Sequence, residues 1–410
     1  MHLRRMMPST LPLKVPLIPR GAWRACAITS SSSSTSPKIK IVRTDSEGLY
    51  PSLDAGVRAM DNVELVLLPE DGTTEDQLVD ACADATILLH CYTPVTERVI
   101  ANAPKLRAVV KYGVGIDKVD IDACIAHGVA VCNVPEYGDE TVAEGAFHLL
   151  LGLAKQCAPL RRRMDAAAWA WPTEAWLGRD LAGMAVGLVG FGKIGAKFAR
   201  MAHGFRMRVL AYDPHVSQGA VDARAWTDDA LAPGTITMVD GLDDLLAHSD
   251  AVSVHAVSNA ETRGLLGARE LALLRPSALA VNVSRGEIWD EGAVVDAVLN
   301  GRLAGVGADV FCSEPITADG HAFSPLVGHP RALLTPHFAF WTAEARDRLC
   351  AEALERCAEA LEGKPLRVLS HDPRLLAQAG GRAAVEFGGW SSASGRHVPP
   401  APAAAARLRR

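Results

Sequence analysis

GLVGFGKIG, at residues 187–195, places three glycines in the spacing G-x-G-x-x-G. The stretch follows an apolar run typical of a buried strand and begins a segment with helical periodicity. Gly190 would allow a sharp turn, Gly192 a close approach of a pyrophosphate to the backbone, and Gly195 close packing of the helix on the strand. The pyrophosphate would lie against free N–H groups at the positive end of that helix. Because strand, glycines and helix occur in this order, the stretch predicts a dinucleotide-binding fold.

The type of dinucleotide is indicated by Asp213, which ends the strand-like run RVLAYD 18 residues after the last of these glycines. A carboxylate there can accept hydrogen bonds from both ribose hydroxyls and would repel a 2′-phosphate. We therefore predict NAD as the cofactor rather than NADP, with Lys193 and Ile194 contacting it from the start of the helix. The alternative for the whole pattern is a glycine-rich turn followed by an unrelated acidic residue.

Short apolar, β-branched runs alternate with helix-like segments from Lys38 to about Pro336. The expected strands lie at residues 39–43, 63–68, 86–90, 106–112, 185–190, 208–213, 251–256, 278–283 and 305–310. Such alternation predicts parallel sheets covered by helices on both faces. Two units of this kind are expected, joined by a long helical segment at 139–167, and the amphipathic helix at 341–363 is expected to pack back onto the first unit. The predicted fold class is α/β, with two Rossmann-like, doubly wound parallel-sheet domains.

The composition is that of an ordinary globular protein, with 49% hydrophobic and 22% charged residues among 410. Residues 45–372 contain 28 Lys and Arg against 46 Asp and Glu, a net charge of −18. Because so acidic a body would repel phosphates, we predict no nucleic-acid partner. No apolar run reaches the length of a membrane span, so no membrane insertion is expected. The nine cysteines contain no C-x-x-C pair and fit no disulfide framework, and we expect reduced, buried thiols and no metal site.

The two ends of the chain differ from this acidic body. Residues 1–37 are rich in Arg and Ser and contain no acidic residue, a composition typical of an organellar transit peptide. The alternative is a disordered tail with no targeting role. The serine run favours a plastid over a mitochondrion, and without a transit peptide the expected location is the cytoplasm. Residues 373–410 form an Ala-, Pro- and Arg-rich segment that is expected to be disordered.

Four polar residues lie at or just after the ends of expected strands downstream of the glycines: Arg285 in NVSRGEIWDE, Asp309 and Glu314 in GADVFCSEP, and His337 in TPHFAFWT. Ligands of open parallel sheets bind beyond these strand ends. Transfer of a hydride to a carbonyl needs a cation to hold the substrate, a proton donor and a group that tunes the donor. These residue types could supply all three. Taken singly, His337 could equally be a satisfied core histidine, and Arg285 a surface residue paired with Glu287.

The ordered motifs resemble those of the D-isomer-specific 2-hydroxyacid dehydrogenases. The resemblance rests on GLVGFGKIG, YD, NVSRGEIWDE, GADVFCSEP and TPH, and it extends upstream to KYGVGIDKVD and VCNVPEYGDETVAEGA. It implies an NAD-binding Rossmann domain at residues 141–335, inserted into a discontinuous substrate domain formed by residues 38–140 plus 336–372. It also implies a homodimer joined through the region that matches residues 139–180.

The same resemblance implies roles for single residues. Arg285 would bind the carboxylate and the carbonyl oxygen of the substrate, and His337 would be the acid/base that protonates this oxygen. Glu314 would hydrogen-bond the imidazole and favour its charged form. Asp309 would help to orient the nicotinamide, whereas His255, near the cofactor, is interpreted as structural.

The loop KYGVGID is implied to contact the substrate carboxylate through the backbone N–H groups of Val114 and Gly115. Lys111, at the start of this loop, could meet a substrate phosphate or could be a solvated lysine at the end of a strand. The aromatic residues that follow the histidine could line the pocket or pack where a helix begins; they are Phe338, Phe340 and Trp341.

The leading interpretation is an NAD-dependent enzyme that interconverts a small 2-keto acid and its D-2-hydroxy acid. Candidate keto acids are glyoxylate, hydroxypyruvate, pyruvate and 3-phosphohydroxypyruvate, and the sequence does not choose among them. The alternative from another class is an NAD-sensing dimeric scaffold like the corepressor branch of the same family. Because that branch can retain the Arg, Glu and His residues, turnover of a keto acid is what distinguishes the two.

Overall fold

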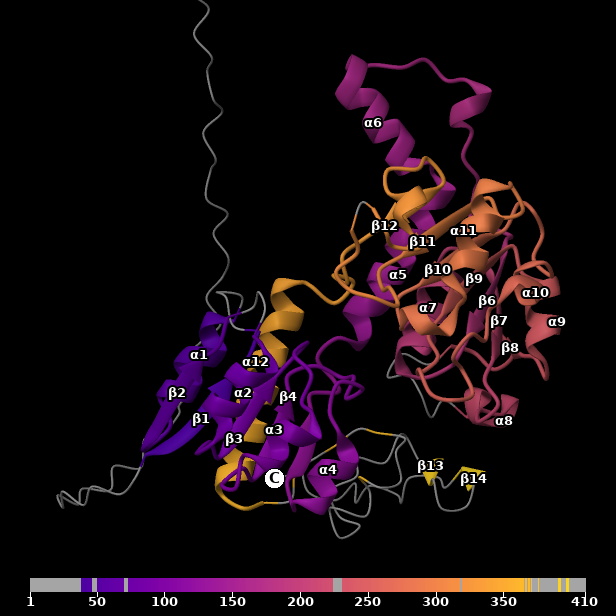
Figure 1. Ribbon diagram of the computed structural model, residues 1–410. Coiled ribbons are helices and arrows are strands. Elements are labelled where there is room, and N and C mark those ends of the chain that lie inside the picture. Colours follow the sequence, from indigo (N-terminus) through magenta and orange to yellow (C-terminus); the bar gives the residue numbers. More distant parts are fainter. Residues whose placement is uncertain are drawn as a thin grey trace, which may run out of the picture. The chain divides into compact units, whose positions relative to one another are not determined.

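The computed structural model describes most of the chain (Figure 1). The described residues are 38–45, 50–69, 73–223, 231–317, 319–364, 366, 368, 370, 375, 390–391 and 396–397. The expected transit peptide at residues 1–37 lies outside them, as does nearly all of the expected disordered tail at 373–410. The predicted α/β fold class is confirmed, because the described part forms a five-stranded and a seven-stranded parallel sheet. A pair of two-residue strands, β13 (Trp390–Ser391) and β14 (Arg396–His397), follows them.

The first sheet has the strand order β2-β1-β3-β4-β5. Its strands are β1 (Ile39–Arg43), β2 (Val63–Leu67), β3 (Ile87–His90), β4 (Ala108–Lys111) and β5 (Ala130–Asn133). Its helices are α1 (Pro51–Arg58), α2 (Glu75–Cys82), α3 (Glu97–Ala101), α4 (Ile121–Ala126) and the distant α12 (Ala343–Leu361). Successive strand residues serve opposite faces of the sheet: Ile41 and Val110 belong to the core shared with α1 and α12, and Val42 and Val109 to the core shared with α2, α3 and α4.

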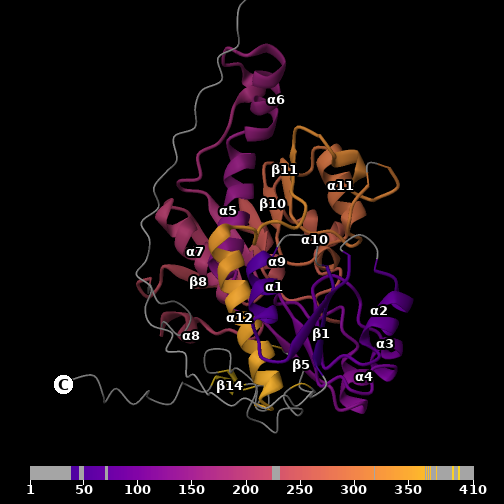
Figure 2. The ribbon, with the colours of Figure 1, turned by 90° about the vertical axis from the view of Figure 1, so that its left-hand side faces the viewer.

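Helix α12 is the segment that returns to the first sheet from the far end of the described chain. Thr342 caps it by accepting the backbone N–H of Ala345 at 3.2 Å. The buried side chains Leu349 and Ala353 share a core with Leu53 of α1, and Figure 2 shows the two helices side by side. The expected return of the last helix is therefore confirmed. Its apolar stripe needs a partner, and the face of the first sheet supplies it.

The second sheet has the strand order β12-β11-β10-β9-β6-β7-β8. Its strands are β6 (Ala185–Val189), β7 (Arg208–Tyr212), β8 (Ile236–Met238), β9 (Ala251–Val254), β10 (Leu279–Asn282), β11 (Gly305–Ala308) and β12 (Ala332–Leu334). One face packs on α5 (Asp139–Ala154) and α7 (Lys193–Gly204), and the other packs on α9 (Leu242–Ala247), α10 (Ala268–Leu271) and α11 (Glu291–Leu299). The short α8 (Gln218–Asp222) precedes β8. The strand order reverses between β6 and β9, and ligands of such sheets bind beyond the strand ends at this reversal.

The long helical segment expected over residues 139–167 is helical, but it forms two helices separated by a break. Helix α5 ends at Ala154, and α6 (Cys157–Ala167) begins after Gln156, whose φ of 56° is left-handed. The carbonyl oxygen of Ala154 accepts the N–H of Arg179 at 2.7 Å, so the returning chain caps α5. Helix α6 has no buried residue. The sequence periodicity continues across the break, but the core that selects α5 does not.

The cysteines were expected from the sequence to be reduced and buried. Six of the eight described cysteines are buried, whereas Cys157 and Cys312 are exposed, and all eight are free thiols.

Among the described helices, none is both long and apolar enough to cross a bilayer.

Candidate functional site

The glycine loop joins the end of β6 to the start of α7. Gly190 has a φ of +90°, and a Cβ on it would lie 2.5 Å from the backbone nitrogen of Ala256. Gly192 is the N-cap of α7 and carries no side chain to cap the helix, and a Cβ on it would meet no atom within 4 Å. No protein atom fills the space beside Gly192, and no side chain caps the N–H groups at the start of α7, an arrangement that leaves them available to a phosphate. Gly195 lies close to the turn, since its Cβ would be 2.8 Å from the Gly190 carbonyl oxygen.

Asp213 follows β7 and links this strand to the glycine loop. One carboxylate oxygen accepts the N–H of Phe191 at 2.9 Å, and the other accepts the N–H of His215 at 2.9 Å. The carboxylate thus lies beside the loop on the neighbouring parallel strand, the place that the ribose of a dinucleotide would occupy. The glycine loop, the uncapped helix and Asp213 together fit a dinucleotide, so the cofactor prediction and the geometry agree.

Replacing Gly192 by Ala should weaken NADH binding by about 10-fold or more and leave the thermal unfolding midpoint nearly unchanged, because the added methyl group would enter the space left for the pyrophosphate and touch no protein atom. Gly190→Ala should lose stability by about 1–3 kcal/mol as well, since its Cβ collides with backbone at a left-handed φ. Fluorescence titration with NADH and calorimetry measure the two effects. Equal losses of stability in both variants would contradict the assignment.

His337 lies between β12 and α12, and its ring is not part of the core. The side chain is 28% exposed, and Nδ1 lies 2.8 Å from a carboxylate oxygen of Glu314. The other oxygen of Glu314 accepts the N–H of Phe311 at 2.9 Å. Burial raises the pKa of Glu314, but the hydrogen bond and charge of His337, the N–H of Phe311 and the charge of Arg285 together bring it below its ordinary value. With Nδ1 engaged, Nε2 is the ring nitrogen left to exchange a proton with a ligand.

Asp309, which is 1% exposed, braces the turn that carries His337. One of its carboxylate oxygens accepts the N–H of Phe338 at 2.8 Å and the hydroxyl of Thr335 at 2.5 Å. The other accepts the N–H of Ala339 at 2.9 Å, and the Asp309 carbonyl accepts the N–H of His337 at 2.7 Å. This turn needs the support, because His337 has a left-handed φ of 58°. The bracing role was not expected from the sequence, and the predicted contact of Asp309 with the nicotinamide stays a prediction.

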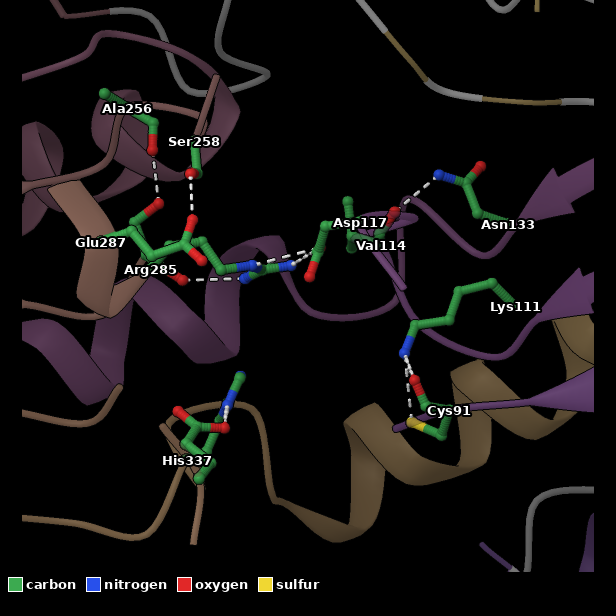
Figure 3. Close-up of polar contacts among 12 residues, drawn as sticks. Cys91, Lys111, Val114, Asp117, Asn133, Ala256, Ser258, Arg285, Glu287 and His337 are labelled. Atoms are coloured by element: carbon green, nitrogen blue, oxygen red, sulfur yellow. Dashed lines mark hydrogen bonds and ion pairs between the residues drawn. The ribbon is translucent and has the colours of Figure 1, made fainter. Parts of the chain in front are cut away.

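Arg285 follows β10 and faces the loop after β4 (Figure 3). Its Nη2 and Nε lie 3.2 and 3.4 Å from one carboxylate oxygen of Asp117, and its Nη1 donates to the Ser284 carbonyl at 2.8 Å. The alternative partner, Glu287, instead contacts Arg263 at 3.3 Å. The charge of Arg285 also helps to lower the pKa of Glu314. The charges of Arg285 and Glu314 are therefore close enough to interact.

The loop after β4 carries the two backbone donors expected to contact an anion. A Cβ on Gly115 would lie 1.7 Å from Nη2 of Arg285, so only glycine admits the guanidinium there. Asn133 donates its side-chain N–H to the Val114 carbonyl at 2.8 Å and holds the loop. Within the described ranges, the N–H groups of Val114 and Gly115 have no protein acceptor. The structure brings both next to Arg285.

Lys111 is neither a solvated lysine nor freely directed at the site. Its side chain is buried, and its ammonium group donates to the Cys91 carbonyl and lies 5.3 Å from the centre of the Tyr92 ring. Asp45 accepts the N–H groups of Cys91, Tyr92 and Thr93 at 2.9 to 3.3 Å. These contacts fix the loop after β3, which sets the Tyr92 ring 6.0 Å from that of His337. Sequence reasoning missed Tyr92, because its partners come from three separate strands.

The remaining aromatic and histidine residues divide between packing and exposure. Trp341 and Phe340 pack where α12 begins, and the ring centre of Trp341 lies 5.5 Å from that of Tyr50. Phe338, in contrast, is 54% exposed. The ring centre of His255 lies 5.2 Å from that of Phe198, and burial lowers the pKa of His255 to about 3. That neutral, packed ring agrees with a structural role. No group of three or more potential metal ligands occurs among the described residues.

The chain is similar to proteins of one enzyme family. Residues 147–339 match the family model described as D-isomer specific 2-hydroxyacid dehydrogenase, NAD binding domain. The chain is 38% identical over 299 residues to D-3-phosphoglycerate dehydrogenase of Mycobacterium tuberculosis, covering 72% of this chain and 52% of that protein. It is 35% identical over 281 residues to glyoxylate reductase of Korarchaeum cryptofilum, covering 68% and 80%. The chain thus spans about half the length of the phosphoglycerate dehydrogenases that it matches and most of the glyoxylate reductase.

The chain also has a fold similar to that of a solved structure. The pyruvate reductase of Chlamydomonas reinhardtii superposes with a TM-score of 0.68 at 25% identity, covering 80% of this chain and 98% of that one.

Proposed function

This chain belongs to the D-isomer-specific 2-hydroxyacid dehydrogenase family, and from that premise we propose that it is an NAD-dependent oxidoreductase that interconverts a small 2-keto acid and its D-2-hydroxy acid. The observation that carries the proposal is the His337–Glu314 pair at 2.8 Å, within electrostatic reach of Arg285. Reduction of a carbonyl beside a carboxylate requires a proton donor and a cation that binds the carboxylate. His337, paired with Glu314, could be the donor, and Arg285 the cation.

The residues of this chain divide the work between holding the cofactor and handling the substrate. The N–H groups at the start of α7 and the carboxylate of Asp213 would hold NAD, which when bound supplies or accepts the hydride. Arg285 and the N–H groups of Val114 and Gly115 would bind the substrate carboxylate. The planar guanidinium suits this task because it can donate two parallel hydrogen bonds.

His337 would move the proton. During reduction its Nε2 would give a proton to the carbonyl oxygen, and during oxidation it would take the proton from the hydroxyl. Glu314 stabilises the positively charged imidazole through Nδ1 and keeps Nε2 directed at the substrate. Asp309 holds the turn, so the ring needs little reorganisation when a ligand binds.

We infer the substrate class from two side chains of the loops near His337. Tyr92 stands near His337, and the buried ammonium group of Lys111 is occupied by the Cys91 carbonyl. This supports a short, unphosphorylated acid such as glyoxylate, hydroxypyruvate or pyruvate over 3-phosphohydroxypyruvate. The relatives named above act, by their names, on both kinds of acid.

The experiment that tests this function is the oxidation of NADH by the purified protein with each of these four acids, followed by absorbance at 340 nm. Rapid turnover of one acid is the expected outcome. If NADH binds and no acid on the panel turns over, the dehydrogenase function is wrong and the NAD-sensing scaffold takes its place. Repeating the assay with NADPH tests the cofactor preference expected from Asp213.

Glu314→Gln should lower kcat/KM for reduction by about 10-fold at pH 7 and move the alkaline fall of the rate to lower pH. Gln keeps an acceptor for Nδ1 but loses the negative charge that favours the protonated imidazole. The pH profile of kcat/KM between pH 5 and 9 measures the shift. A uniform loss at every pH, with no displacement of the profile, would mean that Glu314 has only a structural role.

We also propose that the protein is a homodimer joined through α6 and the segment after it. Helix α6 buries no residue, and Trp169, Trp171 and Leu177 are 61%, 77% and 70% exposed. An apolar surface of this kind marks an interaction site. Sedimentation equilibrium should give twice the mass of one chain, and Trp171→Glu should shift the protein towards the single-chain mass.

A further inference from the structure

Asp117 lies two residues after Gly115 in the loop that follows β4, and Arg285 follows β10 of the other sheet. The two residues are 168 positions apart in the sequence, yet one oxygen of Asp117 accepts from both Nε and Nη2 of Arg285, at 3.4 and 3.2 Å. Figure 3 shows the carboxylate facing one edge of the guanidinium, where the dashed lines end on the same oxygen. The contact joins a loop of the first sheet to a loop of the second.

The guanidinium of Arg285 uses only some of its N–H groups in contacts with the protein. A guanidinium has five N–H groups in one plane. Asp117 takes the Nε hydrogen and one Nη2 hydrogen, which form the side edge, and the Ser284 carbonyl takes one Nη1 hydrogen at 2.8 Å. Within the described contacts, one N–H on each terminal nitrogen is left. Two terminal N–H groups are what a carboxylate or a carboxylate with its neighbouring carbonyl can accept together.

The surroundings direct this remaining pair. The guanidinium lies against Gly115, at which a Cβ would be only 1.7 Å from Nη2. The N–H groups of Val114 and Gly115 have no protein acceptor within the described ranges, so free backbone donors lie beside the guanidinium. Burial raises the pKa of Asp117, but the charge and hydrogen bond of Arg285, a backbone hydrogen bond and the charge of Lys111 together lower it below its ordinary value, so the carboxylate is ionised at neutral pH.

We propose that Asp117 is a positioning residue of the reaction, which holds Arg285 by its side edge so that the terminal N–H pair faces the carboxylate of the keto acid. This inference rests on the proposed function, since it concerns the same bound acid. Asp117 does not touch the substrate. It acts by restricting a long side chain that has many rotamers when unpaired, and restriction before binding improves affinity.

The test compares three variants by steady-state kinetics with the keto acid that the protein turns over best. Asp117→Ala should raise KM by about 10- to 100-fold, the range expected for a hydrogen-bonded charge partner, with a smaller change in kcat. Asp117→Asn, which keeps an acceptor oxygen, should recover part of the loss. Asp61→Asn removes an exposed carboxylate outside the site and should change nothing. The dissociation constant of NADH and the thermal midpoint should stay at the wild-type values in all three.

The decisive measurement is the double variant. If Asp117 acts through Arg285, then Asp117→Ala should cost nothing further in a protein that already carries Arg285→Gln. Additive losses, an unchanged KM, or a KM below that of the wild type would overturn the inference. The last result would mean that Asp117 competes with the substrate for Arg285.

A binding experiment separates this inference from the proposed function. Oxalate, a small dicarboxylate, is titrated calorimetrically into the NADH-loaded wild type and the Asp117→Ala variant. Binding that is about 10-fold weaker in the variant supports the positioning role even if no acid turns over, in which case only the proposed function fails. Equal binding overturns the positioning role even if turnover is rapid.

Discussion

Replacing His337 by Asn should lower kcat for keto acid reduction by about 10²- to 10⁴-fold at pH 7, the range that general acid catalysis supplies. Asn is the suitable replacement because His337 has a φ of 58°, and Asn tolerates left-handed backbone better than other non-glycine residues. The variant loses the group that protonates the carbonyl oxygen and keeps Arg285 and the glycine loop. Stopped-flow and steady-state assays with the best acid of the panel measure the loss.

A matched control for this variant is His248→Asn. His248 also faces a carboxylate, Asp244 at 3.0 Å, but it lies at the end of α9 and is largely exposed. It should retain wild-type kcat. NADH affinity should be unchanged in both variants, because neither histidine lies in the glycine loop. If His337→Asn kept more than a tenth of the wild-type kcat, a different proton donor would have to be sought.

Arg285→Gln should lower kcat/KM by about 10³-fold, since two charge-assisted hydrogen bonds to the substrate at roughly 2 kcal/mol each would be lost. Arg285→Lys should recover only a small part of it. Lysine keeps the charge but presents a point donor in place of a planar fork, and it cannot reach Asp117 and the substrate together. The measurement is kcat/KM for each variant, taken from the dependence of the initial rate on acid concentration.

The control for the arginine variants is Arg263→Gln. Arg263 is a 63% exposed arginine whose partner is Glu287, so its loss should cost little stability and no activity. A loss of kcat/KM in Arg263→Gln as large as that in Arg285→Gln would indicate a general electrostatic effect of the surface instead of a specific substrate contact. Unchanged NADH binding in Arg285→Gln would separate loss of the acid site from loss of the fold.

The fold was predictable to the extent that its signals are local. The nine expected strands all occur, each within one or two residues of its predicted bounds. Among the strands of the two parallel sheets, three were missed. Of these, β8 and β12 have three residues each and lie at the two edges of the second sheet, and β5 is a four-residue edge strand of the first. Such short runs carry too little periodicity, and pairing with a neighbouring strand decides them. The break at Gln156 was missed for a similar reason, since tertiary packing ends α5 there.

The site residues were predictable where a motif follows the end of a strand. Arg285, Glu314 and His337 follow strands of the second sheet whose carboxyl ends lie at one edge, and Glu314 and His337 are in contact at 2.8 Å. What each residue contacts could not be read in the same way. The contact of Asp309 with the nicotinamide stays a prediction, and its three donors in the turn of His337 were not expected from the sequence. Lys111 was left open between phosphate and solvent, and it is buried on the Cys91 carbonyl.

The sequence by itself determined the cofactor fold and the order of the chemical groups, because glycine spacing, strand, helix and strand-end acid lie within 27 consecutive residues, from 187 to 213. Only the tertiary structure decided which carboxylate holds Arg285, which loop carries Tyr92 to His337 and where the long helix breaks. Each of these depends on contacts between segments that are distant in the chain. Their energies come from burial and hydrogen bonding, which no local pattern encodes.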